Sequence, residues 1–336
     1  MSGRPLALSL GDPAGIGPEI VSKAWRMKPV GGARFFAVGD IDVIRSAPGG
    51  DSTPLVEIAR AGDATAMFDQ ALPVLHRPLK TPVVFGRVDP AHASGTIAWI
   101  EEATALALSG EACGLVTAPI NKATLYAAGF PYPGHTEFLA ALTAHVAVPE
   151  PRGPVMMLAT EGLRVCLATI HKPLAEVSSS LSIEGLVTAG LVIGSALRRD
   201  FGVEEPRLAV AGLNPHAGEA GALGLEEIDI ITPAVAALRK HGLDASGPAP
   251  ADSLFHPAAR ERFDAVLCMY HDQGLIPLKM LDFWGGVNIT LGLPIVRTSP
   301  DHGTGFDIAG QGIARADSLI KAIEMAALIA KRRGSD

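Results

Sequence analysis

The sequence predicts an α/β fold with a largely parallel sheet, distributed over two domains. Short apolar runs alternate with longer stretches rich in Ala and Leu along the chain, which is typical of strands and helices that alternate around a parallel sheet. The chain has 336 residues, and at about 150 residues per domain this length indicates roughly two domains. Apolar residues make up 48% of the chain and charged residues only 19%, so large cores can form.

The elements are expected in alternating order. Strands are predicted at residues 6–10, 35–38, 82–85, 114–117, 155–159, 163–170, 207–213, 265–270 and 287–291. Helices are predicted at residues 18–27, 95–108, 182–199, 226–241, 257–262 and 315–333. Residues 46–53 and 247–252 are rich in Gly, Pro, Ser and Asp, so we expect loops there.

Charge and composition exclude several classes of function. The chain carries 28 Lys and Arg against 35 Asp and Glu, a formal net charge of −7, which argues against binding to nucleic acid or to an anionic membrane surface. Three cysteines without a close pair predict neither a disulfide framework nor a thiolate zinc site. The first apolar run is too short for a signal peptide, and no run reaches the roughly 18 residues of a membrane span. We therefore expect a cytoplasmic protein.

Three histidines stand at or just past the ends of predicted strands. His171 follows residues 163–170, His216 lies shortly after residues 207–213, and His271 follows residues 265–270. Ligands of open α/β sheets bind outside the carboxyl ends of the strands. If these strands are neighbours, three imidazoles could hold a metal and leave one position open, and neutral nitrogen ligands favour Zn, Co, Ni or Mn. The spacing is not a local metal motif, so ordinary surface histidines are the alternative interpretation.

Several polar motifs are candidates for binding an anion. His135 and Thr136 follow a Pro-rich stretch and could bind phosphate or carboxylate, although Thr136 could equally cap a helix that begins near residue 138. Lys279, Asn288 and Arg297 lie in an otherwise apolar, Gly-rich stretch. A cation placed there needs either a carboxylate partner or an anionic ligand.

The turn after the first strand is rich in glycine but carries no nucleotide-binding fingerprint. Gly15 and Gly17 permit a sharp turn, and Pro18 suits the first position of a helix. The segment is not G-x-G-x-x-G, and no P-loop occurs in the chain. A tight strand-to-helix turn is at least as good an interpretation as direct ligand contact.

Taken together, these motifs resemble one enzyme family. Residues 11–19, 134–137, 270–274, 288–294 and 297–304 stand in the order found in the 4-hydroxythreonine-4-phosphate dehydrogenase family of pyridoxal phosphate synthesis. The resemblance covers nearly the whole chain. Residues 11–19 and 302–310 are also similar to motifs of the wider isocitrate/isopropylmalate dehydrogenase superfamily, which binds NAD without the usual fingerprint.

The resemblance implies an architecture and a set of site residues. It implies two α/β/α domains of the isocitrate/isopropylmalate dehydrogenase type with the active cleft between them. The first, on the cofactor side, comprises residues 1–135 and 290–336. The second, residues 136–289, bears the metal site and the interface of a homodimer with shared active sites. The implied residues are His171, His216 and the partner subunit's His271 for one divalent metal ion (Zn, Co, Mn or Mg), His135, Thr136, Lys279, Asn288 and Arg297 for substrate, and His302, Gly303, Thr304 and Asp307 for NAD or NADP.

The implied reaction is oxidation followed by decarboxylation. The substrate would be 4-phosphooxy-L-threonine and the product 3-amino-2-oxopropyl phosphate, in pyridoxine 5'-phosphate biosynthesis. Lys279 and Asp252 are the candidates for the general base. A paralogous dehydrogenase acting on threonate or erythronate 4-phosphate is the nearest alternative. A tri-histidine metallohydrolase is more remote, because residues 302–310 resemble a cofactor loop. A phosphate acyltransferase of similar fold would not need three histidine ligands.

Overall fold

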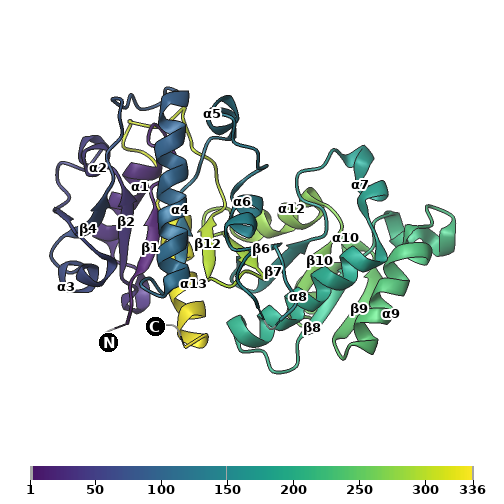
Figure 1. The fold of residues 1–336 in the computed structure, drawn as a ribbon. Helices are drawn as coiled ribbons and strands as arrows, with labels where there is room; N and C mark the ends of the chain where they lie inside the picture. Colours follow the sequence, from purple (N-terminus) through teal and green to yellow (C-terminus); the bar gives the residue numbers. More distant parts are fainter. Residues whose placement is uncertain (1–2, 149, 335–336) are drawn as a thin grey trace. The chain divides into compact units, whose positions relative to one another are not determined.

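The protein consists of two compact units, seen in a computed structural model that describes residues 3–148 and 150–334 (Figure 1). Unit 1 comprises Met1–Val146 and Pro294–Asp336, and unit 2 comprises Ala147–Leu293. The resemblance had implied boundaries after residues 135 and 289. The first observed boundary, after Val146, lies later in the chain than the expected one. It keeps helix α6 (His135–Leu142) whole within unit 1, where α6 contacts helix α4 (Ala93–Ser109).

Unit 1 is built on a fully parallel sheet with the strand order β3-β4-β2-β1-β5-β12. Its strands are β1 (Leu6–Ser9), β2 (Phe35–Gly39), β3 (Leu55–Glu57), β4 (Leu72–His76), β5 (Leu115–Thr117) and β12 (Arg297–Pro300). Its α-helices are α1 (Gly17–Met27), α2 (Ile41–Ser46), α3 (Ala64–Met67), α4, α5 (Lys122–Ala127), α6 and α13 (Asp317–Arg332). Figure 1 shows α4 across the near face of this sheet, whereas α1 and α13, which contact each other, lie behind it.

Unit 2 has the strand order β11-β6-β7-β10-β8-β9. Its strands are β6 (Val155–Thr160), β7 (Leu163–Leu167), β8 (Arg207–Ala211), β9 (Asp244–Ala249), β10 (Ala265–Cys268) and β11 (Val287–Leu291). Its helices are α7 (Leu174–Ser180), α8 (Ile183–Phe201), the π-helical turn Glu227–Ile231 that continues into α9 (Thr232–Lys240), α10 (Ala251–Leu254), α11 (Pro257–Arg260) and α12 (His271–Leu281). Strands β7, β10, β8 and β9 run parallel, and β6 pairs antiparallel with both β7 and β11.

The core of unit 2 explains why β7 and β10 occupy the middle of its sheet. Val165 of β7 and Val266 of β10 are fully buried, and each lies in a cluster that also includes Leu275 and Leu278 of α12. Strands buried on both faces read as continuous apolar runs, as β10 does; β7 is interrupted only by the partly buried Arg164. The helix after β10 therefore folds back over the sheet and begins at its carboxyl edge.

The structure confirms the α/β class and corrects several elements. Residues 82–85 form no strand; Val84 is 58% exposed and the segment is a loop. The strand in that part of the sheet is β4, which contains Pro73 and was missed because proline is unfavourable within a strand. Residues 247–252 are partly strand, since β9 extends to Ala249. Helices α5, α7 and α12 were also missed, and α6 begins at His135 rather than near residue 138; α12 includes Pro277, which helices disfavour.

Among the described residues, no single helix is long and apolar enough to cross a membrane. Helices α7 and α8 meet that criterion only as a pair, and they are bent by 91° relative to each other.

Candidate active site

The three histidines follow neighbouring strands. Strand β10 pairs in parallel with β7 on one side and with β8 on the other, so the carboxyl ends of all three meet at one edge of the sheet. His171 follows β7 and His271 begins α12 directly after β10; their ring centroids are 5.9 Å apart. The neighbouring strands that the metal hypothesis required are therefore present in unit 2.

His216 lies on an unusual turn after β8. Residues 216–220 all have left-handed backbone angles, with φ of 51° at His216, 53° at Ala217 and 81° at Gly218. Such angles cost non-glycine residues roughly 1–2 kcal/mol each, so they persist only where surrounding contacts enforce them. Buried Glu227 supplies such contacts: its Oε1 accepts hydrogen bonds from the amides of Leu213 and Asn214, both at 2.7 Å.

The donor set fits a divalent metal, although the structure does not bring all three rings together. Imidazole nitrogens are ligands that Zn and Co prefer, and two of the rings already face one edge of the sheet within 5.9 Å. The ligand atoms of His171, His216 and His271 do not meet within 4.8 Å inside the described part of one chain. Their assignment as ligands stays a prediction.

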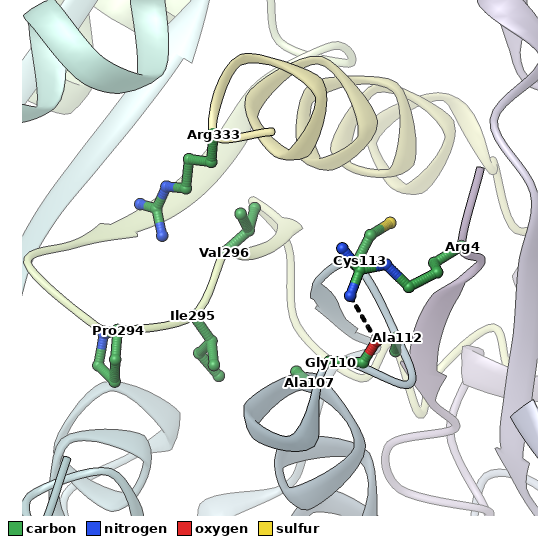
Figure 2. A pocket seen from close by; sticks show the side chains of 9 residues that line it. All are labelled: Arg4, Ala107, Gly110, Ala112, Cys113, Pro294, Ile295, Val296 and Arg333. Carbon is green, nitrogen blue, oxygen red and sulfur yellow. Dashed lines mark hydrogen bonds between the residues drawn. The ribbon is translucent and has the colours of Figure 1, made fainter. Parts of the chain in front are cut away.

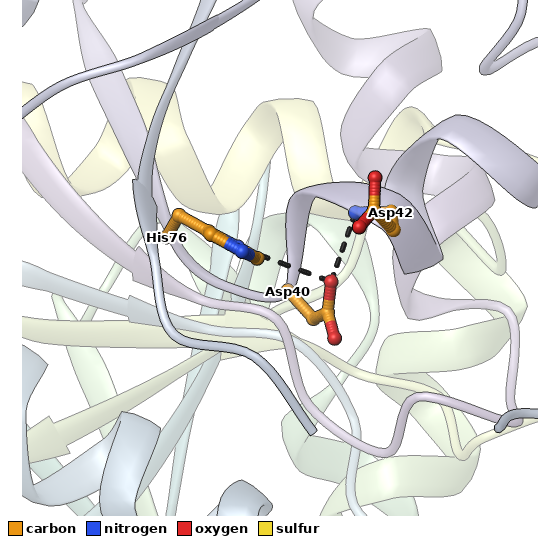
Figure 3. Close-up of side chains that lie close together, drawn as sticks. All are labelled: Asp40, Asp42 and His76. Carbon is orange, nitrogen blue, oxygen red and sulfur yellow. Dashed lines mark hydrogen bonds and ion pairs between the residues drawn. The ribbon is translucent and has the colours of Figure 1, made fainter. Parts of the chain in front are cut away.

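A different group, in unit 1, does bring three possible ligand atoms within 4.8 Å of one another: Asp40, Asp42 and His76 (Figure 3). Asp40 caps α2, with Oδ1 accepting from the Asp42 amide at 2.9 Å and Oδ2 from the Leu79 amide at 2.8 Å. Nδ1 of His76 accepts from the amide of Ile41 at 3.1 Å. These bonds identify the group as a helix cap that joins the ends of β2 and β4.

The anion candidates of unit 1 form one cluster. Arg297, at the start of β12, is 2% exposed, and its Nη2 donates to Oγ1 of Thr117 at 2.7 Å. Burial lowers the pKa of Arg297 to about 10, an effect that the nearby carboxylate of Glu137 opposes. The guanidinium therefore stays charged at neutral pH.

His135 of the same cluster is a neutral imidazole. Burial, together with the positive charges of Arg297 and Lys122, lowers the pKa of His135 well below its ordinary value. Its Nε2 is buried and has no hydrogen-bond partner among residues 3–148 and 150–334. Because buried polar atoms are normally satisfied, this nitrogen is suited to a ligand. Lys122 was not among the residues singled out in the sequence.

The structure corrects the interpretation of Thr136 as a helix cap. Helix α6 begins at His135, Gly134 occupies the N-cap position, and no side chain caps the helix. Thr136 lies within the first turn, where backbone amides without partners favour an anion. His135 and Thr136 therefore both stand at the start of one helix.

The remaining substrate candidates lie in unit 2. Asn288 of β11 has a buried Oδ1 that accepts no hydrogen bond within the described part of the chain. Lys279 lies on α12, where its Nζ is 5.3 Å from the ring centroid of Phe283. Asp252 is exposed on the short helix α10.

The predicted cofactor loop of unit 1 rests on the turn after β1. The carbonyl of Thr304 accepts a hydrogen bond from the Ile16 amide at 2.9 Å. A Cβ at Gly15 would lie 2.8 Å from that same carbonyl oxygen, so glycine is required there. At Gly303 a side chain would meet open space, whereas His302 and Asp307 are exposed. The Gly-rich turn thus supports this loop and leaves its outer surface accessible.

Unit 1 also contains a small cavity of about 70 Å³ that none of the predicted site residues lines (Figure 2). Arg4 borders it and donates to the Gly110 carbonyl at 2.8 Å; Cys113 and Arg333 are among its other lining residues. The cavity lies by the end of α4, and no function is assigned to it from the sequence.

Comparisons with known proteins identify the family of the chain. The family model described as pyridoxal phosphate biosynthetic protein PdxA matches residues 32–326. A protein of Caulobacter vibrioides named 4-hydroxythreonine-4-phosphate dehydrogenase is 64% identical over 99% of this chain and 100% of its own length. One of Maricaulis maris with the same name is 53% identical over 98% of both. A crystal structure of 4-hydroxythreonine-4-phosphate dehydrogenase from Klebsiella pneumoniae is 41% identical over 98% of both chains, with a TM-score of 0.85. The chain thus belongs to the PdxA family of pyridoxal phosphate biosynthetic proteins.

Proposed function

We infer that the protein is a 4-hydroxythreonine-4-phosphate dehydrogenase, an oxidoreductase of pyridoxal phosphate biosynthesis. The observation that carries this inference is the 64% identity to a protein of that name over essentially the full length of both chains. The sites agree with it, because they offer a buried cation beside a neutral histidine in unit 1 and histidines at one sheet edge in unit 2.

The residues of unit 1 suit the phosphate of 4-phosphooxy-L-threonine. Arg297 can donate two parallel hydrogen bonds to phosphate oxygens, and the partnerless Nε2 of His135 can contribute one more polar contact. Thr136 adds a hydroxyl at the start of α6. Lys279 and Asn288 of unit 2 are the proposed contacts to the same substrate, with Lys279 or Asp252 as the general base.

We assign the metal to His171, His216 and the partner subunit's His271. A divalent ion on these nitrogens would supply Lewis-acid stabilisation of the negative charge that develops on the substrate oxygen. NAD or NADP would lie against His302, Gly303, Thr304 and Asp307, on the accessible side of that loop. The choice of nicotinamide, the identity of the metal and a cytoplasmic location stay predictions.

The proposal includes a homodimer with shared active sites. An apolar surface on and after α12 supports it: Ile276 is 62% exposed, Met280 81% and Phe283 61%, and the Phe283 and Trp284 rings pack edge to face at 5.0 Å. Trp, Phe and Met are enriched in the centres of protein interfaces. Because α12 starts at His271, a second copy seated on this surface would stand beside a histidine of the proposed site.

A panel of substrates tests the proposed reaction. NADH formation would be measured with 4-phosphooxy-L-threonine, threonate 4-phosphate and erythronate 4-phosphate. We expect the highest kcat/KM with 4-phosphooxy-L-threonine. A higher value with threonate or erythronate 4-phosphate would instead identify a paralogous dehydrogenase. Phosphate release without NADH formation would indicate a hydrolase.

A further inference from the structure

The ends of β7, β10 and β8 are tied to one another by side chains that the proposed reaction does not use. Beyond the last residues of β7 and β10, two backbone hydrogen bonds continue the pairing, from the Ala168 amide to the Cys268 carbonyl and from the Thr169 amide to the Met269 carbonyl, while each chain segment continues toward a histidine. Buried side-chain hydrogen bonds add to the backbone pairing at this point. They connect the three segments in pairs.

Gln273 connects the end of β10 with the end of β8. It is 8% exposed and lies in the first turn of α12, two residues after His271. Its Oε1 accepts from the Met269 amide at 2.7 Å, and its Nε2 donates to the Gly212 carbonyl, also at 2.7 Å. These partners fix the orientation of the side-chain amide, because one is a donor and the other an acceptor.

Thr169 connects the end of β7 with the end of β10. The residue is 6% exposed and precedes His171 by two positions. Its Oγ1 donates to the Met269 carbonyl at 2.7 Å, and its own amide donates to the same oxygen at 3.2 Å. Met269 thus receives contacts from both neighbouring strand ends, through Thr169 on one side and Gln273 on the other.

A third connection joins the His216 turn to the helix that follows His171. Nδ2 of Asn214 donates to Oε2 of Glu226 at 2.7 Å, and Oγ of Ser178 donates to Oε1 of Glu226 at 2.5 Å. Ser178 lies on α7. Nδ2 of Asn214 also donates to Oε2 of Glu227 at 2.9 Å, which holds the chain two residues before the left-handed turn.

We propose that Gln273 is a positioning residue of the metal site and that Thr169 acts with it, by setting the spacing of the three histidine-bearing strand ends. The inference rests on the proposed function, since it takes these histidines as ligands. It holds whether the ligands come from one chain or from two, because a shared site still requires each chain to present its histidines at a defined spacing. Groups that orient metal ligands commonly change metal affinity by about 10- to 100-fold when they are removed.

The test compares Gln273→Met with two threonine variants and a control at the opposite end of the same strands. Thr169→Val removes the hydroxyl at constant shape, whereas Thr169→Ser keeps it. The control, Asp264→Asn, breaks the pair between Asp264 and Arg207 at the starts of β10 and β8, where Asp264 Oδ1 and Arg207 Nη2 are 3.0 Å apart. It weakens unit 2 without touching the histidine ends.

Two readouts are used: the affinity and visible spectrum of Co²⁺ bound to the purified protein, and amide hydrogen exchange of the metal-free protein. We expect Gln273→Met to bind Co²⁺ about 10-fold more weakly or worse, with a changed spectrum and faster exchange at residues 212–214, 216 and 269. Thr169→Val should change in the same direction, while Thr169→Ser and Asp264→Asn should keep the wild-type affinity and spectrum. If Gln273→Met does not fold, the comparison of Thr169→Val with Thr169→Ser still tests the inference.

Wild-type Co²⁺ affinity in both Gln273→Met and Thr169→Val would overturn the inference. So would a loss of Co²⁺ affinity in Asp264→Asn as large as that in Gln273→Met, because the effect of Gln273 would then be merely structural. Unchanged hydrogen exchange in Gln273→Met would overturn it as well. If the wild-type protein binds no Co²⁺, the proposed metal site fails. The exchange measurement then still decides whether Gln273 positions the strand ends.

Discussion

At the scale of single residues, the proposed phosphate site combines a charged side chain with a neutral one. Burial leaves Arg297 with a pKa of about 10, so this side chain is cationic throughout the neutral range. The same burial, with the charges of Arg297 and Lys122, lowers the pKa of His135 well below its ordinary value. The buried charge of Arg297 therefore does not change with pH near 7, and its proposed contribution to substrate binding should not change either.

Replacing Arg297 by methionine should raise KM for the phosphorylated substrate. A hydrogen bond to a charged group contributes about 1.5–3 kcal/mol, which corresponds to roughly 10- to 150-fold in KM. The measurement is steady-state NADH formation over a range of substrate concentrations. Arg4→Met is the control, because Arg4 bonds only the Gly110 carbonyl among the contacts the structure shows. An unchanged KM in Arg297→Met would reduce Arg297 to a structural partner of Glu137.

The pair Asp264–Arg207 should make the stability of the protein depend on pH. Burial by itself raises the pKa of Asp264, but hydrogen bonds from Arg207 and its charge outweigh that effect and lower the pKa below the ordinary 3.8. Stabilisation from a carboxylate of lowered pKa is complete above the unfolded pKa and is lost as pH falls through the folded one.

Asp264→Asn should therefore cost about 1 kcal/mol of unfolding free energy at pH 7, the upper end for partly exposed ion pairs. The difference from wild type should shrink as pH falls through the lowered pKa of Asp264 and vanish once Asp264 of the folded protein is protonated as well. Urea unfolding of both proteins at pH 7 and at low pH checks this. A difference that stays constant down to the lowest pH would show that the charge of Asp264 contributes nothing.

At the scale of elements, the left-handed turn of residues 216–220 depends on one glycine. Gly218 has φ of +81°, and a Cβ there would lie 2.7 Å from Oε2 of Glu227. Gly218→Ala should destabilise unit 2 by about 2–3 kcal/mol, from the backbone angle together with displacement of Glu227. Thermal unfolding with and without metal measures the loss.

Gly242→Ala is the matched control for that variant. Gly242 has φ of +79°, but nothing lies within 4 Å of the position its Cβ would take. It should lose only the roughly 1–2 kcal/mol of the backbone angle and keep its metal affinity. Equal effects of the two substitutions on metal affinity would show that Glu227 does not support the His216 turn.

The sequence predicted the strands that precede the histidines better than the elements around the proposed phosphate cluster. Strands β7, β8 and β10 are mostly apolar runs and could be located from the pattern, although each ends two or three residues earlier than predicted. Helix α6 is only eight residues long and has no capping side chain, so its start at His135 gave no signal. Gln273 could not be recognised as a bridge, since its partners Met269 and Gly212 meet only through the pairing of β10 with β8.

At the scale of the whole molecule, the proposed shared site predicts complementation between two inactive variants. His171→Ala and His271→Ala would be unfolded and refolded together. If the partner subunit's His271 completes the site, a mixed dimer has one site with both defects and one site with none. Activity should then recover to as much as one active site per mixed dimer.

The exposed side chains on α12 provide the control for that experiment. Met280→Glu places a charge on the surface that a second copy would cover, since Met280 is 81% exposed in the single chain. Sedimentation should then show monomers, and complementation should be lost. Mixed dimers that form but stay inactive would contradict the shared site.

The central claim is a metal-dependent oxidation of 4-phosphooxy-L-threonine, and the most direct test is NADH formation from that substrate before and after removal of divalent metal. The purified protein would be treated with a chelator, freed of it, and then given Zn²⁺, Co²⁺ or Mn²⁺, with His216→Ala carried through in parallel. We predict that the wild-type protein loses activity with the chelator and regains it with at least one of these ions, whereas His216→Ala stays folded but binds less metal and shows little activity throughout. Full NADH formation in the chelated wild-type protein, or wild-type metal content and turnover in His216→Ala, would contradict the account.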